Sequence, residues 1–179
     1  GETIDESFGS SYDSRKEDYY WNIIFYNSNT SAKHLLSESK MLISNYTNDY
    51  GSSSGGSNNT IAINSSKKHL FYNIRVFDGN SNGKLDLSDP EYLFISTRTG
   101  LNLQQLSPKN THLVSWNYIE SSNKVMMNVQ NDANADKIWD DKDQLITYEY
   151  DLNTNISKLV FDGKYKENLK ENFTKNWLK

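Results

Sequence analysis

Short apolar stretches rich in β-branched and aromatic residues alternate with polar turns along most of the chain. From residue 61 onward such stretches follow one another closely, at residues 61–63, 70–77, 92–96, 103–106, 113–119, 125–129, 145–150 and 157–161. Each is typical of a strand, and their spacing predicts an antiparallel all-β domain. Nearer the N-terminus we expect a strand within residues 19–26. Residues 34–43 fit either a strand or a short helix, and the preceding turn favours a strand.

The two ends of the chain break this alternation. Residues 1–17 are polar and acidic, which predicts a flexible lead before a single domain over residues 18–179. At the C-terminus an apolar residue recurs every fourth position, at Tyr165, Leu169, Phe173 and Trp177. This spacing predicts an amphipathic helix over residues 164–179. We expect the helix to dock on the sheet, with binding to a partner as the alternative.

Two segments of the chain share one plan, at about residues 70–106 and 125–160. Each has an apolar strand, an acidic loop, a second strand, a turn and a short final strand. A repeated β-meander predicts propeller-like blades or a duplicated sandwich. Two full units are too few to close a propeller of about 4–8 blades. The sequence therefore predicts a partial propeller or a sandwich-like fold.

The first acidic loop, DGNSNGKLDLSD, has oxygen-bearing residues at the spacing of a twelve-residue calcium loop. Calcium takes six to eight oxygens, and such loops supply them from positions 1, 3, 5, 7, 9 and 12. In this loop those positions hold Asp78, Asn80, Asn82, Lys84, Asp86 and Asp89. Lys84 would bind through its backbone carbonyl. Gly83 lies at position 6, where a sharp turn favours a residue without Cβ.

The second acidic loop, DANADKIWDDKD, follows the same spacing. Its corresponding positions hold Asp132, Asn134, Asp136, Ile138, Asp140 and Asp143. Lys137 replaces glycine at position 6, where a left-handed conformation costs roughly 1–2 kcal/mol. The apolar position 8 holds Trp139, as Leu85 does in the first loop, and can anchor the loop to the core.

Together the two loops predict two Ca²⁺ sites, because both occur at equivalent places in the repeat. Asp89 and Asp143 occupy position 12, where EF-hands usually have a bidentate Glu. The shorter side chain favours structural binding at high free calcium over micromolar sensing. Magnesium is a poorer candidate because it requires tighter octahedral geometry.

Composition narrows the class of protein further. The net charge of −4 argues against a nucleic-acid partner, which requires a basic face. The chain has no Cys, and no apolar stretch is long enough for a membrane span. His34, His69 and His112 lie far apart in the sequence and show no catalytic motif. We therefore expect a binding protein and not an enzyme.

The two loops resemble EF-hand and dockerin calcium loops at the positions named above. The wider segment 70–161, with DPEYLFIS and LNLQQLSP, resembles calcium-binding periplasmic proteins and lipoproteins of Bacteroidetes. In these, a DxNxDG loop lies between two strands of a TolB-like propeller blade. The resemblance implies Ca²⁺ binding and a periplasmic, cell-surface or secreted location. It also implies a removed signal sequence, with a lipid anchor upstream as an open alternative.

The sequence thus favours a calcium-binding module whose loops bind Ca²⁺ structurally and shape a surface for a protein or glycan. Two alternatives remain open at this point. One is a hydrolase or lactonase-like propeller fragment, and the other is a regulatory sensor that changes conformation with calcium.

Overall fold

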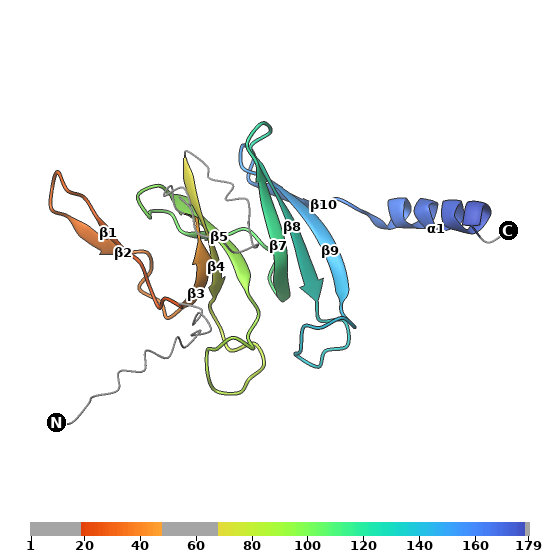
Figure 1. Ribbon diagram of the computed structural model, residues 1–179, viewed down its shortest axis with the longest axis horizontal. Coiled ribbons are helices and arrows are strands. Elements are labelled where there is room, and N and C mark those ends of the chain that lie inside the picture. The colour runs from red at the N-terminus through yellow and green to blue at the C-terminus, as the bar shows by residue number, and fades with distance from the viewer. Residues whose placement is uncertain (1–18, 48–67, 178–179) are drawn as a thin grey trace, which may run out of the picture.

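The computed structural model describes residues 19–47 and 68–177 of the chain. The flexible lead expected at residues 1–17 and the strand expected at 61–63 lie outside these residues. In the described part, two four-stranded antiparallel sheets form most of the molecule (Figure 1). The all-β antiparallel meander predicted from the alternating pattern is therefore confirmed, together with a helix near the C-terminus.

Each of the two sheets is a meander whose strands pair in chain order. The first contains β3 (Leu42–Tyr46), β4 (His69–Arg75), β5 (Tyr92–Thr97) and β6 (Gln104–Gln105). The second contains β7 (Thr111–Ile119), β8 (Lys124–Asn131), β9 (Gln144–Asp151) and β10 (Ile156–Leu159). Both acidic loops join the second and third strands of their sheets.

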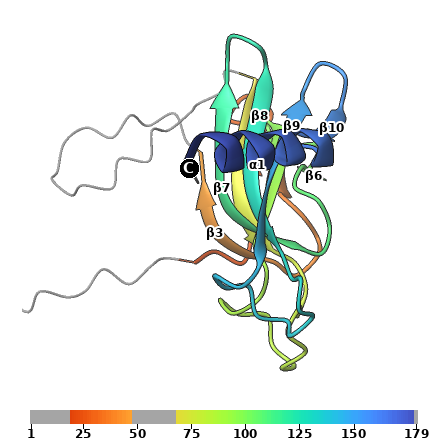
Figure 2. The ribbon, with the colours of Figure 1, turned by 90° about the vertical axis from the view of Figure 1, so that its right-hand side faces the viewer.

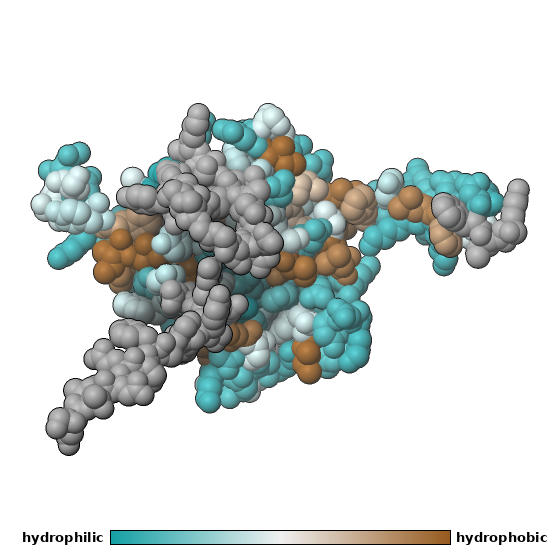
Figure 3. All heavy atoms as spheres, in the orientation of Figure 1, coloured by the Kyte–Doolittle hydropathy of each residue, from teal (hydrophilic) through white to brown (hydrophobic). Residues whose placement is uncertain are grey.

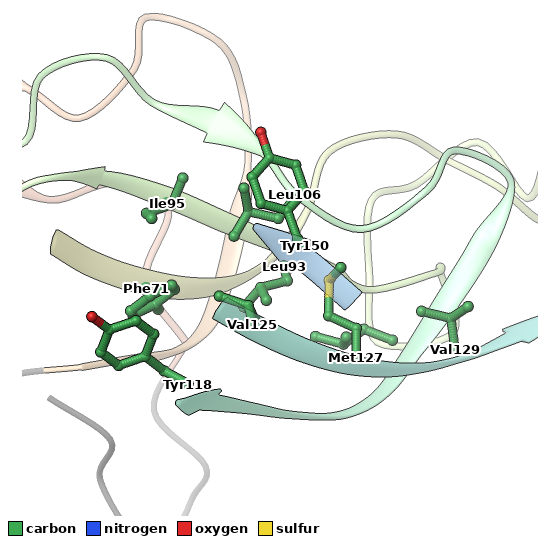
Figure 4. Packing of buried hydrophobic residues seen from close by; sticks show 10 residues of the cluster. Phe71, Leu93, Ile95, Leu106, Tyr118, Val125, Met127, Val129 and Tyr150 are labelled. Atoms are coloured by element: carbon green, nitrogen blue, oxygen red, sulfur yellow. The ribbon is translucent and has the colours of Figure 1, made fainter. Parts of the chain in front are cut away.

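The main core lies between the two sheets, which pack face to face (Figure 4). Val125, Met127 and Val129 alternate along β8 with more exposed residues, so all three point to the first sheet. Phe71 and Leu93 meet them from β4 and β5, and both are fully buried. A period of two is what a strand with one buried face requires.

The opposite face of the first sheet is covered by a two-stranded hairpin, formed by β1 (Ile24–Tyr26) and β2 (Lys33–Leu35). A second core lies beneath this hairpin and includes Ile43 and Tyr72. Phe25 of β1 packs against it and stacks on His34, with ring centroids 5.4 Å apart. Its ring also lies over the turn between β5 and β6. A Cβ at Gly100 would lie 2.2 Å from this ring, and Gly100 has a φ of 76°. The close approach and the left-handed backbone both require glycine there.

The outer face of the second sheet is centred on polar groups. Glu149 accepts ion pairs from Lys124 at 2.8 Å and from Lys158 at 3.1 Å. Asn128 bonds Ser115 and Thr147 on the neighbouring strands. The described strands thus form a sandwich-like pair of sheets and not a closed propeller.

Residues 34–43 do not form one element, which corrects the expected strand or helix. The segment is divided between β2 and β3, and these strands belong to different sheets. A polar turn separates the strands, and Asn22 Nδ2 donates to the Ser37 carbonyl there at 2.6 Å. Beyond the turn, Ile43 pairs with Tyr20 through an isolated bridge. The apolar pattern could not show this change of partner.

The C-terminal helix α1 (Gly163–Trp177) forms where the sequence predicts it, but it does not dock on a sheet. It extends away from the body of the molecule (Figures 1 and 3), and no strand of the described chain packs against it. Leu169 on its apolar face is 50% exposed. Its first turn is held by Asp162, which accepts a hydrogen bond from the Tyr165 N–H at 2.8 Å. None of the described helices is long and apolar enough to cross a membrane.

Replacing Met127 by alanine tests the core between the sheets. Met127 is 1% exposed, so its truncation should lower the free energy of unfolding by about 2–5 kcal/mol. Met126→Ala is the matched control, because Met126 lies on the opposite face of β8 and should cost about 1 kcal/mol or less. Urea denaturation measures both. Equal losses would contradict the burial of Met127 between the two sheets.

The undocked helix gives a second expectation. Leu169→Ala should change the free energy of unfolding of the sheets by no more than about 0.5 kcal/mol, because no strand packs against the helix. Urea denaturation followed by the near-ultraviolet signal of the core aromatics measures it. A loss comparable to that of Met127→Ala would mean that the helix docks on the sheets in solution.

Candidate calcium-binding loops

The two acidic loops lie side by side at one end of the molecule. Residues 78–89 follow β4 and residues 132–143 follow β8, and both loops extend below the sheets in two perpendicular views (Figures 1 and 2). Because the sheets pack face to face in the same orientation, their equivalent connections come out at the same end. The sequence predicts which residues of each loop could bind a metal ion. It does not predict that the two loops lie next to each other.

In the first loop, the side chains at positions 1, 3 and 5 turn inward to the loop backbone. Asp78 accepts hydrogen bonds from the N–H groups of Asn82 at 3.0 Å and Gly83 at 2.7 Å. Asn80 Oδ1 also accepts from the Asn82 N–H, at 2.9 Å. Asn82 Oδ1 accepts from the Lys84 N–H at 2.8 Å. The oxygens of Asp78 and Asn80 therefore lie close together, around one backbone N–H.

The residue at position 12 closes the first loop. Asp89 is 1% exposed, and its two carboxylate oxygens bond opposite ends of the loop. Oδ1 accepts from the Gly79 N–H at 2.8 Å, and Oδ2 accepts from the Asp86 N–H at 2.8 Å. Arg75 of β4 donates to the Asp89 carbonyl at 3.0 Å and so ties this residue to the sheet.

The second loop repeats most of these bonds at the same positions. Asp132 at position 1 accepts from the Lys137 N–H at 3.0 Å. Asn134 accepts from the Asp136 N–H at 3.1 Å, and Asp136 accepts from the Ile138 N–H at 2.8 Å. Two sequences that differ at most positions between the ligands thus fold into the same turn.

Position 12 of the second loop has the same role as in the first. Asp143 is 8% exposed, and its carboxylate accepts from the Ala133 N–H at 3.0 Å and the Asp140 N–H at 3.1 Å. In both loops position 12 therefore joins positions 2 and 9. Asp suffices there because the backbone approaches closely enough to be reached by the shorter side chain.

The backbone is left-handed at the same two positions in both loops. At position 6, Gly83 has a φ of 84° and Lys137 a φ of 62°, which is the conformation that the spacing predicts. At position 4, Ser81 has a φ of 63° and Ala135 a φ of 58°. Residues with a Cβ are rarely left-handed, so three of these four positions carry backbone strain. No sequence signal indicated the strain at position 4.

One carboxylate oxygen in the second loop has no hydrogen-bond partner. Asp132 Oδ1 is buried and unpaired among the described residues. The corresponding oxygen of Asp78 has the Asn82 N–H as its donor, whereas the Asp136 N–H bonds Asn134. A buried, unpaired carboxylate oxygen is unfavourable, and a cation would compensate it. The second loop therefore fits a cation at position 1.

Carboxylates alone do not complete either site. Among the described residues, no three or more His, Asp or Glu side chains are grouped so that they could hold a metal ion. A calcium ion would have to draw on amide oxygens from Asn80, Asn82 and Asn134. It would also need backbone carbonyls and water, which calcium accepts readily.

The acid at position 9 is held ionised in both loops. Hydrogen bonds from the Ser88 hydroxyl and backbone N–H lower the pKa of Asp86. The backbone N–H of Lys142, followed by its ammonium group, lowers the pKa of Asp140. Lys142 Nζ lies 3.2 Å from Asp140 Oδ2 and would compete with a metal ion for this oxygen. Both carboxylates carry a negative charge at neutral pH, which favours binding of a cation.

The loops also contact each other directly, which the sequence did not reveal. Lys137 Nζ donates to Ser81 Oγ at 2.8 Å. Trp139 lies against Gly79, where an added Cβ would be 3.2 Å from the indole ring and 2.4 Å from Pro90. Glycine at this position thus makes room first for Pro90 and then for the indole of Trp139.

His112 lies beneath this contact and has a structural role. Its ring centroid is 6.4 Å from that of Trp139, and its Nδ1 accepts a hydrogen bond from the Glu91 N–H at 3.1 Å. Burial lowers the pKa of His112, an effect that nearby Glu91 opposes and Arg75 reinforces. The imidazole is therefore neutral at pH 7, which leaves Nδ1 free to accept.

A lowered His pKa makes stability depend on pH. The neutral form is favoured by folding, so its contribution is present above the ordinary His pKa of 6.5 and is lost as pH falls below it. Without calcium, the melting temperature should fall between pH 7 and pH 5. His112→Gln keeps an acceptor and does not titrate, so it should reduce this fall. An identical pH profile for both proteins would contradict the assignment.

Comparison of the chain with family models found no match, and neither the curated proteins nor the solved structures included a similar one. The geometry of the two loops is therefore the basis for the function proposed below.

Proposed function

We propose that the two loops bind Ca²⁺ as structural ions. The proposal rests on the hydrogen-bonded turn that both loops share. In the second loop, this turn leaves the buried Asp132 Oδ1 without a partner among the described residues. Hydrogen bonds already order most of the donor side chains in both loops. An ordered donor set reduces the conformational entropy lost on binding and so favours capture of an ion.

Each site would use the donors that the twelve-residue spacing assigns. The proposed ligands are Asp78, Asn80, Asn82, the Lys84 carbonyl, Asp86 and Asp89 in the first loop, and Asp132, Asn134, Asp136, the Ile138 carbonyl, Asp140 and Asp143 in the second. Position 9 acts directly or through water. These are hard oxygen donors of mixed charge, which suits Ca²⁺ better than zinc or copper.

The gain from calcium would be rigidity of the two connections. Without the ion, carboxylates of like charge lie in the same short loops and repel one another, and left-handed residues add strain. Calcium neutralises the charge and adds about RT ln(1 + [Ca²⁺]/Kd) to the stability for each site. Because both oxygens of Asp89 and Asp143 also serve backbone N–H groups, we propose binding at the high free calcium of a periplasmic or extracellular setting.

The calcium-loaded loops would form one polar surface at this end of the sheets. We propose that this surface binds a protein or a glycan, since two rigid neighbouring loops offer a fixed set of polar groups. Regulatory sensing would require a large conformational change. Both loops are joined directly to long, paired strands of the sheets, which favours the structural role.

Calcium should raise the melting temperature of the protein. At 100 times Kd each filled site adds about 2.7 kcal/mol, which for a chain of this size is a rise of roughly 5 °C or more. Magnesium at the same concentration should give a much smaller rise. Differential scanning calorimetry with calcium, magnesium or chelator measures the effect. An unchanged melting temperature in millimolar calcium would overturn the proposal.

Substitutions in the second loop localise the effect. Asp132→Asn should abolish the part of the calcium-dependent rise that this loop contributes. Asp141→Asn is the matched control, because Asp141 lies at position 10, is exposed and is not a proposed ligand. It removes the same charge from the same loop. If both variants lose the same share of the rise, net charge and not coordination causes it.

A further inference from the structure

The contact between the loops affects how tightly each loop binds Ca²⁺, an inference that rests on the proposed function. We propose that the two calcium sites form one coupled unit in which filling one loop raises the affinity of the other, with Trp139 as the main contact that transmits the effect. Coupling of this kind is a free energy shared between two sites and acts equally in both directions.

Trp139 lies next to residues of both proposed calcium sites. In its own loop it lies between Ile138 and Asp140, which supply the proposed ligands at positions 7 and 9. Its ring packs against Gly79, which directly follows Asp78 at position 1 of the first loop. The indole N–H is buried and unpaired among the described residues, so packing and not a hydrogen bond fixes the ring.

The surface that receives Trp139 is itself part of the first site. The Gly79 N–H donates to Asp89 Oδ1 at 2.8 Å, and Pro90 directly follows Asp89. Calcium bound by Asp78 and Asp89 would therefore hold Gly79 and Pro90 in place. A fixed Gly79 and Pro90 would in turn hold Trp139 and the backbone of the second site.

Two further contacts run parallel to this one. Lys137, at position 6 of the second loop, donates to Ser81 at position 4 of the first. Beneath the loops, Trp139 lies over His112, which accepts from the Glu91 N–H two residues beyond Asp89. The left-handed residues Lys137 and Ser81 thus connect the two turns, and His112 connects Trp139 to the chain just beyond the first loop. The ordering of one loop lowers the entropy lost when the other binds, which is a source of positive cooperativity.

Isothermal titration of the folded chain with CaCl₂ tests the coupling. The quantity to compare is the product of the association constants of the two sites. This product should be larger in the wild type, by about fivefold or more, than the product of the constants measured for each site alone. Asp78→Asn and Asp132→Asn provide the separate sites. The Trp139→Leu variant gives the second loop a leucine at position 8, as in the first loop. Both ions should still bind to this variant, but the ratio of the wild-type-like product to the product of the separate sites should fall toward one.

A second readout uses the fluorescence of Trp139 itself. In Asp132→Asn, calcium can enter the first loop alone and should still change the tryptophan emission, and adding Trp139→Leu should remove that change. Leu85→Ala is the control, because it alters position 8 of the first loop and leaves both Trp139 and Gly79 unchanged. Two independent sites in the wild type, or a ratio unchanged by Trp139→Leu, would overturn the coupling while leaving calcium binding intact. Absence of binding in the wild type would instead overturn the proposed function.

Discussion

Face-to-face packing of the two four-stranded sheets determines where everything else in the molecule lies. Val125, Met127 and Val129 on β8 bury one face of the second sheet against Phe71 and Leu93 of the first. A slip of one residue in either sheet would turn these side chains to the solvent, so burial fixes the register. Because both sheets are meanders in the same orientation, their equivalent loops leave the packed pair side by side. The contact between the loops is thus a result of the core.

Each of the two loops holds several carboxylates of like charge within one tight turn. Backbone N–H groups satisfy most of the oxygens, and those at position 12 join the beginning and the end of each loop. The first loop adds glycine at position 6, whereas the second has Lys137 there and leaves Asp132 Oδ1 unpaired. These differences make the second loop the more strained of the two when empty. It therefore has more to gain from a bound cation.

Local patterns in the sequence predicted the strands, the helix and the spacing of the oxygen-bearing residues in the loops. Each of these features depends on residues that are close along the chain. What they could not predict depends on distant partners. The turn that divides residues 34–43 between two sheets, the exposed position of α1, and the meeting of Trp139 with Gly79 all belong to this group. An apolar helix face such as that of Leu169 shows that a helix is amphipathic, but not what it packs against. Left-handed Ser81 and Ala135 gave no signal, because neither residue type favours that conformation.

We propose that each loop captures one calcium ion. Equilibrium dialysis of the purified chain against millimolar ⁴⁵Ca²⁺, followed by counting of the bound ion, measures this directly. We expect two ions bound per chain, and one per chain when Asp132 is replaced by Asn. Bound calcium close to zero at this concentration would contradict it.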